Sequence, residues 1–334
     1  MREDEGMTIR PLPALVVFAV LVGAACTSGD GDKPPSATLT AGPTSDASSF
    51  SAQVASSDLA AGKPEAVQVG VFSSTEDAGV RLLSFGEVDI SFSFLGADGS
   101  QEPVPGPTTT GRFVPAPGNA DADGEVPTLT NPADVAGVYM TPELTFPEAG
   151  IWSASVTTSV DGGAPMTLDA AFTVYPEHRI PAPGDDALPT KNLTTASKGV
   201  PAVAIDSRAQ DGSKVPDPQL HDATIVETIR AGRPVLVQFA TPVYCQSQFC
   251  GPTVEAQETL EREYRDVAEF IHVEIWRDYE RSTVNEAAAD WLLRDDSLTE
   301  PWMFLIDADG VIAERWGPLF DLDDVRASLD ALRG

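Results

Sequence analysis

Residues 234–252 read Pro-Val-Leu-Val-Gln-Phe-Ala-Thr-Pro-Val-Tyr-Cys-Gln-Ser-Gln-Phe-Cys-Gly-Pro, and they contain the most informative pattern of the chain. Residues 235–239 are almost continuously apolar, as in a strand that is covered on both faces of its sheet. Pro252 favours the first position of a helix, which we expect to run to about Arg265. Cys245 and Cys250 therefore lie between a buried strand and a helix. Free amides at a helix start favour a thiolate at Cys250.

The sequence around this segment alternates between further strands and helices. Upstream, Val203–Ile205 is a short apolar strand, and Asp217-Pro218 begins a helix that stops at Gly232. Downstream we expect strands at 270–275, 301–306 and 311–313, a helix at about 282–293 and a last helix over about 322–332. The expected order is β-α-β-α-β-α-β-β-α.

This order and three local features resemble the thioredoxin fold over about 135 residues. The buried strand precedes the cysteine segment, Cys250-Gly251-Pro252 matches the start of the family's Cys-Gly-Pro-Cys motif, and Glu300-Pro301 matches its cis-proline. The resemblance implies an α/β thioredoxin-like fold for residues 202–334. It also implies that Pro301 is cis, that the residue before it packs against the redox sulfurs, and that Pro301 holds the substrate chain alongside them.

The chain departs from the family at three positions. Thr253 replaces the second cysteine of the motif, Gln238 stands where thioredoxins have a buried acid, and Phe249 replaces a tryptophan. The available partner of Cys250 is Cys245, and the four residues between them can close through a turn to the Cα separation of about 5.5–6 Å that a disulfide needs.

The cysteine pair has two competing interpretations. In the first, Cys250 is the attacking thiolate and Cys245 resolves the mixed disulfide, so the protein is a thiol–disulfide oxidoreductase acting on client thiols or disulfides. In the second, the disulfide is a static crosslink that stabilises the loop by about 2 kcal/mol in a binding or assembly protein. A third hypothesis is a copper chaperone with Cys245, Cys250 and His272 as ligands, since thiolates and imidazole suit copper. The sequence leaves open whether the protein is an enzyme.

The N-terminus is typical of an exported bacterial lipoprotein. Residues 12–25 are apolar but too few to span a bilayer, and they end at Val22-Gly23-Ala24-Ala25-Cys26, which resembles a lipobox. This resemblance implies a signal peptide over 1–25 and a lipidated Cys26 that anchors the protein to a membrane outside the cytoplasm. Cysteine pairs oxidise in such a compartment.

Three segments separate the anchor from the C-terminal domain. Residues 26–51 are rich in small and polar residues and indicate a flexible stalk. Residues 52–176 contain short alternating runs such as 88–94, which predict an all-β immunoglobulin-like sandwich. Residues 177–201 contain Pro181, Pro183 and Pro189 and indicate a Pro-rich linker.

Composition narrows the possible partners. The 334 residues include 51 acidic and 21 basic side chains, for a net charge of −30, which argues against a nucleic-acid partner because phosphate binding requires clustered Lys and Arg. The chain lacks a phosphate-binding glycine loop, a Gly-x-Ser-x-Gly elbow and a His-Glu-x-x-His motif, so we expect no cofactor.

Overall fold

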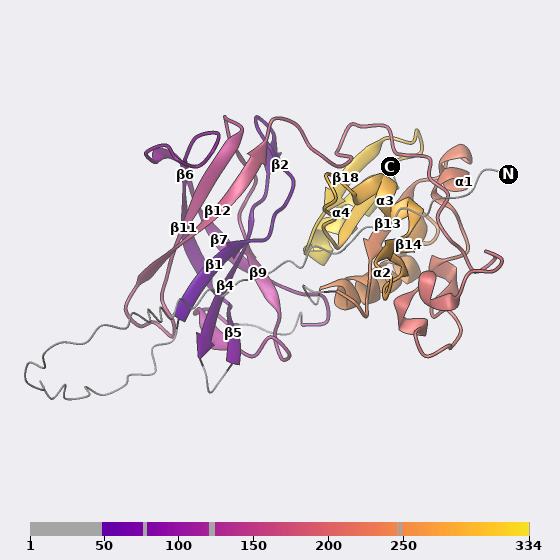
Figure 1. Ribbon diagram of the computed structural model, residues 1–334, viewed down its shortest axis with the longest axis horizontal. Helices are drawn as coiled ribbons and strands as arrows, with labels where there is room; N and C mark the ends of the chain where they lie inside the picture. Colours follow the sequence, from indigo (N-terminus) through magenta and orange to yellow (C-terminus); the bar gives the residue numbers. More distant parts are fainter. Residues whose placement is uncertain (1–48, 76–78, 120–123, 246, 248, 334) are drawn as a thin grey trace, which may run out of the picture.

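The computed structural model describes residues 49–75, 79–119, 124–245, 247 and 249–333. A large β-sheet lies on one side, and a smaller unit with a mixed sheet and short helices lies on the other (Figure 1). None of the helices formed by these residues combines the length and apolar character that a membrane span requires. The expected signal peptide over 1–25, the lipidated Cys26 and most of the stalk over 26–51 fall outside the described residues.

The N-terminal unit is one curled sheet of ten strands. The strand order is β2-β12-β11-β6-β7-β9-β4-β5-β8, with β1 paired to β4. The bounds are β1 Ser49–Val54, β2 Leu59–Ala60, β4 Gln68–Thr75, β5 Gly79–Ser84, β6 Glu87–Phe94, β7 Val104–Pro115, β8 Thr128–Thr130, β9 Gly137–Met140, β11 Gly150–Thr158 and β12 Met166–Tyr175. The short strands β3 Pro64–Glu65 and β10 Leu144–Thr145 pair separately.

The predicted immunoglobulin-like sandwich of two separate sheets is wrong, because hydrogen bonding continues through β6, β7, β9 and β4. The alternation that predicted β6 is present: Val88, Ile90 and Phe92 are buried, and the residues between them are exposed. A register shift between Ser91 and Ser93 interrupts the β6–β7 ladder. Such irregularities increase strand bending, which lets one sheet curl around its own apolar face.

The C-terminal unit contains a four-stranded sheet in the order β14-β13-β17-β18, in which only β13 and β14 are parallel. Strand β13 is buried along its whole length, as its continuous apolar run predicted. The strands are β13 Val235–Ala240, β14 Glu269–Glu274, β17 Trp302–Ile306 and β18 Ile312–Trp316, with a separate pair β15 Trp276–Asp278 and β16 Thr283–Val284. The helices are α1 Ile225–Arg230, α2 Cys250–Tyr264, α3 Glu286–Leu292 and α4 Leu322–Ala331.

The predicted α/β thioredoxin-like fold class is also contradicted. The chain is mostly β, with 37% strand, 17% helix and four helices in the described part, and it is not a helix-rich α/β fold. The segment expected to supply the first strand and helix explains much of the difference. Residues Ala202–Ala204 form a 3-10 turn (η1), Pro218–Leu220 form another (η3), and helix α1 begins only after the Thr224 cap.

The segment predicted as a linker, 177–201, packs closely against the C-terminal unit. Ile180 and Ala187 are buried in the core that β13, β17 and α3 share. Buried Asn192 accepts a hydrogen bond from the Ile225 amide at the start of α1. The proline-rich composition indicated an extended path but could not indicate this packing.

Candidate functional site

Cys245 and Cys250 form a disulfide beside the buried strand β13. Their Cα atoms are 6.0 Å apart, within the range that disulfides adopt. Cys250 is the first residue of α2 and is fully buried, whereas Cys245 in the preceding loop is partly exposed. The Cys250 amide donates a hydrogen bond of 3.4 Å to Cys245 Sγ. The two cysteines thus differ in exposure, and Cys245 is the more accessible of the two.

The first turn of α2 is joined to β13 by two residues at which the sequence departs from the thioredoxin pattern. Gln238 Nε2 donates to Thr253 Oγ1 at 2.6 Å, and Thr253 Oγ1 donates to the Cys250 carbonyl at 3.1 Å. Both side chains are fully buried. Gln238 and Thr253 are therefore complementary, because the buried Gln238 amide has the Thr253 hydroxyl as its hydrogen-bond acceptor. This pairing holds Cys250 at a fixed place on the sheet.

Glu300 lies next to the disulfide, and the sequence did not identify it as a site residue. Its carboxylate and both cysteine sulfurs lie within 4.8 Å of one another. Its Oε2 atom is buried and has no hydrogen-bond partner among the described residues. Burial, together with the negative charge of Glu274, raises the pKa of Glu300 to about 8. A neutral carboxyl group therefore faces the sulfurs at neutral pH.

The backbone at Pro301 places Glu300 in this position. The Glu300–Pro301 peptide is cis, as the resemblance implied, and β17 begins at the next residue. The sequence did contain a signal for Glu300, because the residue before the proline was expected to pack against the sulfurs. What it lacked was any sign that one carboxylate oxygen at that position would be buried without a hydrogen-bond partner among the described residues.

An aromatic pair lies beside the partly exposed cysteine. The Tyr244 and Tyr279 rings stack in parallel with centroids 4.1 Å apart, and Trp276 contacts Tyr279 edge to face. Tyr279 is 46% exposed and Val243 is 39% exposed. Exposed aromatic and apolar side chains thus lie next to Cys245 in the chain or stack on its neighbour Tyr244, as is suitable for contact with a protein client.

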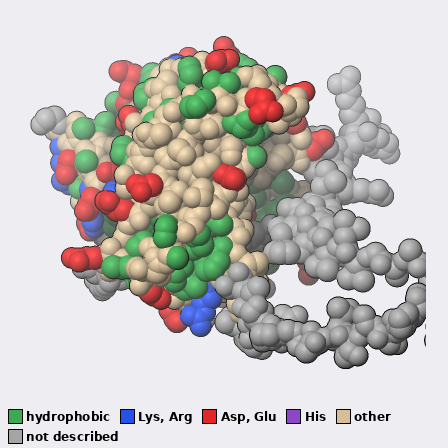
Figure 2. Space-filling view, turned by 90° about the vertical axis from the view of Figure 1, so that its left-hand side faces the viewer, with side chains coloured by type: hydrophobic (Ala, Val, Ile, Leu, Met, Phe, Trp, Pro, Cys, Tyr) green, Lys and Arg blue, Asp and Glu red, His purple; other side chains and the backbone are tan. Residues whose placement is uncertain are grey.

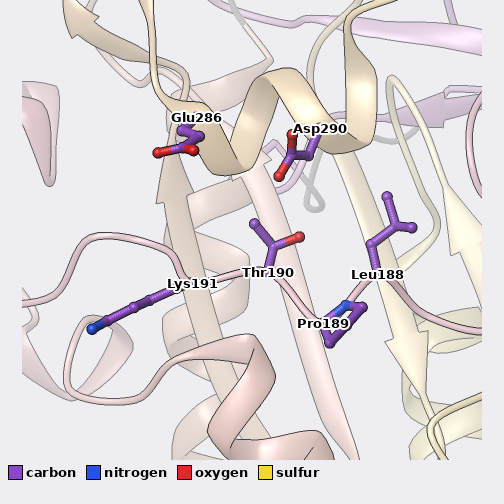
Figure 3. A pocket seen from close by; sticks show the side chains of 6 residues that line it. All are labelled: Leu188, Pro189, Thr190, Lys191, Glu286 and Asp290. Carbon is purple, nitrogen blue, oxygen red and sulfur yellow. The ribbon is translucent and has the colours of Figure 1, made fainter. Parts of the chain in front are cut away.

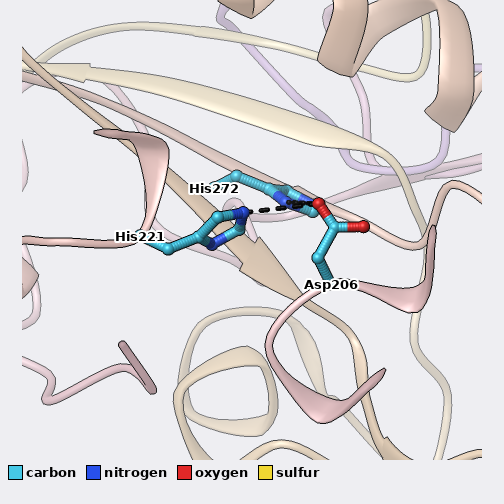
Figure 4. Close-up of side chains that lie close together, drawn as sticks. All are labelled: Asp206, His221 and His272. Atoms are coloured by element: carbon cyan, nitrogen blue, oxygen red, sulfur yellow. Dashed lines mark hydrogen bonds and ion pairs between the residues drawn. The ribbon is translucent and has the colours of Figure 1, made fainter. Parts of the chain in front are cut away.

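His272, the third candidate copper ligand, is engaged elsewhere. It lies on β14 with His221 and Asp206 in a fully buried cluster (Figure 4), and its Nε2 is 3.1 Å from the Ala240 carbonyl. Although burial opposes ionisation of Asp206, the neighbouring His221, His272 and Arg208 hold its pKa well below the usual range. Burial lowers the pKa of His221. The group around the sulfurs contains Glu300, and His272 is not part of it.

The surface offers a shallow hollow between α3 and residues 188–191. Glu286 and Asp290 line it from the helix, while the Lys191 side chain points away from both (Figure 3). Its Thr190 hydroxyl already accepts a hydrogen bond from Trp291. At the end of the molecule formed by the N-terminal sheet, acidic side chains are scattered singly and basic ones are few (Figure 2). Neither surface brings reactive groups together as the cysteine pair does.

Comparison with known proteins adds no family. The sequence matches no protein-family model and no curated protein.

Proposed function

We propose that this protein exchanges disulfides with client proteins through the Cys245–Cys250 pair. The observation that carries the proposal is the asymmetry of the pair: a partly exposed cysteine is bonded to a fully buried one at a helix start, and a carboxyl group lies within 4.8 Å of both sulfurs. A purely structural crosslink requires neither the helix start nor the unpartnered acid.

The asymmetry assigns the steps of the exchange. A client thiolate attacks Cys245 Sγ, a client–Cys245 disulfide forms, and the Cys245–Cys250 bond breaks with Cys250 leaving as a thiolate. The helix start stabilises that thiolate, and a good leaving thiolate speeds exchange. A second client thiol then attacks the client sulfur and releases Cys245. The client has been oxidised and the cysteine pair reduced; the reverse sequence reduces a client.

Glu300 supplies the proton in this scheme. The neutral carboxyl can donate to the Cys250 thiolate as it leaves, and the resulting carboxylate can take the proton back when the pair is reoxidised. From its position at the helix start, Cys250 is predicted to be the attacking thiolate. The burial of Cys250 in the oxidised form supports a different first step, in which Cys245 is the sulfur attacked.

The exchange can be tested with single-cysteine variants in a Cys26→Ala background. Cys250→Ser leaves the partly exposed Cys245 thiol, and Cys245→Ser leaves the buried Cys250 thiol. We expect the first variant to form mixed disulfides with a peptide that contains a disulfide at least about tenfold faster, because access limits the second; in each case the thiolate attacks the peptide disulfide and a peptide thiolate leaves. Mass spectrometry of quenched samples gives both rates.

The second candidate function is a binding or assembly protein with a static disulfide, and the full burial of Cys250 favours it. The Cys26→Ala protein that keeps both Cys245 and Cys250 distinguishes it from an exchange protein. If the disulfide is static, the cysteine pair would not exchange with glutathione in any redox buffer, and its reduction potential would lie below about −300 mV. Such a result, with neither single-cysteine variant forming a mixed disulfide, would contradict exchange.

We also propose that the protein acts outside the cytoplasm, anchored to a membrane through a lipid on Cys26. The apolar stretch and the lipobox-like residues 22–26 support this proposal. Cys26→Ala should move the protein from the membrane fraction to the soluble fraction of expressing bacteria. Continued membrane association of that variant would count against lipidation.

A further inference from the structure

The buried cluster of Asp206, His221 and His272 lies apart from the disulfide and takes no part in the proposed exchange. Asp206 caps the 3-10 turn η2 (Ser207–Ala209), His221 follows η3, and His272 is on β14. All three residues have 0% exposure. Figure 4 shows both imidazole rings directed at the same carboxylate oxygen.

In the tautomer that its contacts favour, His272 has one ring nitrogen without a hydrogen-bond partner among the described residues. Its Nε2 atom faces the Ala240 carbonyl at 3.1 Å, so the ring proton belongs on Nε2. The Nδ1 atom then presents a lone pair to Asp206 Oδ2 at 3.5 Å, and it has no hydrogen-bond partner in the described part of the chain. Two acceptors that face each other in a buried place require a proton or a metal ion between them.

The contacts of Asp206 Oδ2 distinguish a metal ion from a proton. This oxygen faces Arg208 Nη2 at 2.7 Å, Arg208 Nε at 3.2 Å, His221 Nε2 at 3.3 Å and His272 Nδ1 at 3.5 Å. Arg208 already donates two hydrogen bonds to this oxygen, and the His272 contact cannot be a hydrogen bond while the ring proton is on Nε2. The Arg208 Nη2 contact has the length of a charge-assisted hydrogen bond, about 2.7–2.9 Å, and the two histidine contacts are longer.

The longer contacts match a coordination polyhedron. With zinc–ligand distances of about 2.0–2.1 Å and tetrahedral angles, neighbouring donor atoms are about 3.4 Å apart. The two histidine–aspartate separations, 3.3 Å and 3.5 Å, fit this spacing. An octahedral site with the same bond lengths would place them closer, at about 3.0 Å. In addition, the Nε2 contact of His272 with a backbone carbonyl is typical of metal-bound histidines.

The charges around the cluster also favour a cation. Arg208 Nη1 contacts Asp217 at 3.0 Å and Glu258 at 2.9 Å, so one guanidinium meets three carboxyl groups, that of Asp206 included. A divalent ion would balance the excess acid.

We propose that Asp206 Oδ2, His221 Nε2 and His272 Nδ1 bind one divalent transition-metal ion of the zinc class. The three ligands come from separate segments, so the ion would join residues 206–221 to the sheet. Ser207, next to the first ligand, accepts a hydrogen bond from the Val243 amide in the loop that carries Cys245. The ion would therefore support the cysteine loop from behind, and a water molecule or hydroxide would fill the fourth tetrahedral position that the three protein ligands leave.

The test uses Zn²⁺ and the oxidised protein in a Cys26→Ala background, so that no free thiol competes for the ion. Because the cluster is fully buried, the protein is unfolded in chelator and refolded with or without Zn²⁺. We expect one zinc per chain by elemental analysis after gel filtration, and an increase of roughly 5 °C or more in unfolding temperature. Refolding with Co²⁺ should give the intense visible bands of a tetrahedral site.

Variants locate the ion. His272→Gln and Asp206→Asn should each lose most of the bound zinc, whereas the control His178→Gln changes the one histidine outside the cluster and should retain it. The zinc content of the refolded protein with an intact cluster tests the proposal even if a cluster variant fails to fold. Refolded wild-type protein without stoichiometric zinc, or with zinc that both cluster variants retain, would overturn the proposal. So would nitrogen NMR showing a protonated His272 Nδ1 in zinc-refolded protein.

Discussion

A single carboxyl group determines how the proposed redox site should respond to pH. Glu300 has a folded pKa of about 8 against a model-compound value of 4.5, so the folded state holds this proton between those values while the unfolded state releases it. The free energy of unfolding must therefore fall as pH rises from about 5 to 8. Glu300 faces the sulfurs, so the same ionisation places a negative charge beside the departing Cys250 thiolate.

Replacing Glu300→Gln should remove both effects. Relative to the variant, the wild type should lose on the order of 2 kcal/mol of stability between about pH 5 and pH 8, a figure reduced from the full shift because the side chain is partly exposed. Denaturant unfolding at a series of pH values measures this difference. The exchange rate, corrected for client thiolate, should fall above about pH 8 in the wild type only.

Glu280→Gln is the matched control, because Glu280 is an exposed acid in the same unit. It should leave both pH profiles unchanged. If Glu300→Gln altered stability but left the pH profile of exchange as in the wild type, Glu300 would be a structural residue and not the proton donor.

At the scale of elements, the attachment of helix α2 to strand β13 depends on a buried side-chain pair. Thr253→Val removes the acceptor of the Gln238 amide and should lower the free energy of unfolding by about 2 kcal/mol, because a buried donor is left without a partner. Adding Gln238→Met removes the donor as well. The double variant should recover part of the loss, and a double-mutant cycle in denaturant measures the coupling.

Additive effects of the two substitutions would contradict this coupling. Thr259→Val is a suitable control on the same helix, because Thr259 is partly exposed, and its hydroxyl donates to the Glu255 carbonyl one turn earlier and accepts a solvent-exposed bond from Arg262. That variant should change stability by less than about 0.5 kcal/mol.

The elements near the cysteines could be predicted because their signals are local. A continuous apolar run marked β13, Pro252 marked the beginning of α2, and the spacing of Leu322, Val325 and Leu329 marked α4, and these elements are confirmed. Residues 202–224 were predicted wrongly, because three-residue turns have no periodicity to detect. Their structure depends on tertiary contacts, such as the bond from the Ser207 amide to buried Glu274.

Pairing between distant segments explains the remaining errors. The alternation of residues 88–94 identifies a strand and its buried face but does not identify the neighbouring strands. One curled sheet and two packed sheets are therefore both compatible with the same local pattern. Prediction of the two sites has the same limitation. Asp206 and Glu300 gain their chemistry from burial and from residues far away in the sequence.

At the scale of the whole molecule, the two units share a contact beside the redox site. Phe249, which precedes Cys250, packs with Ala116 and Val138 of the N-terminal unit and with Leu319. Gln68 on β4 is buried, and its amide nitrogen donates to the carbonyls of Gly317 and Leu319. The curled sheet therefore supports the loop that leads into α2, and a client that reaches Cys245 meets a site supported by both units.

Arg315 on β18 is the central charged residue of this junction. Its guanidinium has 6% side-chain exposure and contacts Asp58 at 2.7 Å and Glu65 at 3.1 Å, both from the N-terminal unit. Although burial raises the pKa of Asp58, the bonds from His178 and Arg315 lower it to about 2. Because that value is below the unfolded one, the stabilisation is present above about pH 4 and is lost as pH falls toward 2.

Arg315→Met should therefore lower the free energy of unfolding by about 3 kcal/mol at neutral pH, since it leaves buried carboxylates without their counter-charge. The effect should shrink at about pH 2–3, where Asp58 becomes protonated, and denaturant unfolding at both pH values measures it. Arg112→Met is the control, because Arg112 makes an exposed ion pair with Asp321 across the same junction and should cost less than about 1 kcal/mol. Equal losses in the two variants would show that the buried network does not hold the units together. A larger loss at Arg315, together with faster proteolysis between the units, would show that it does.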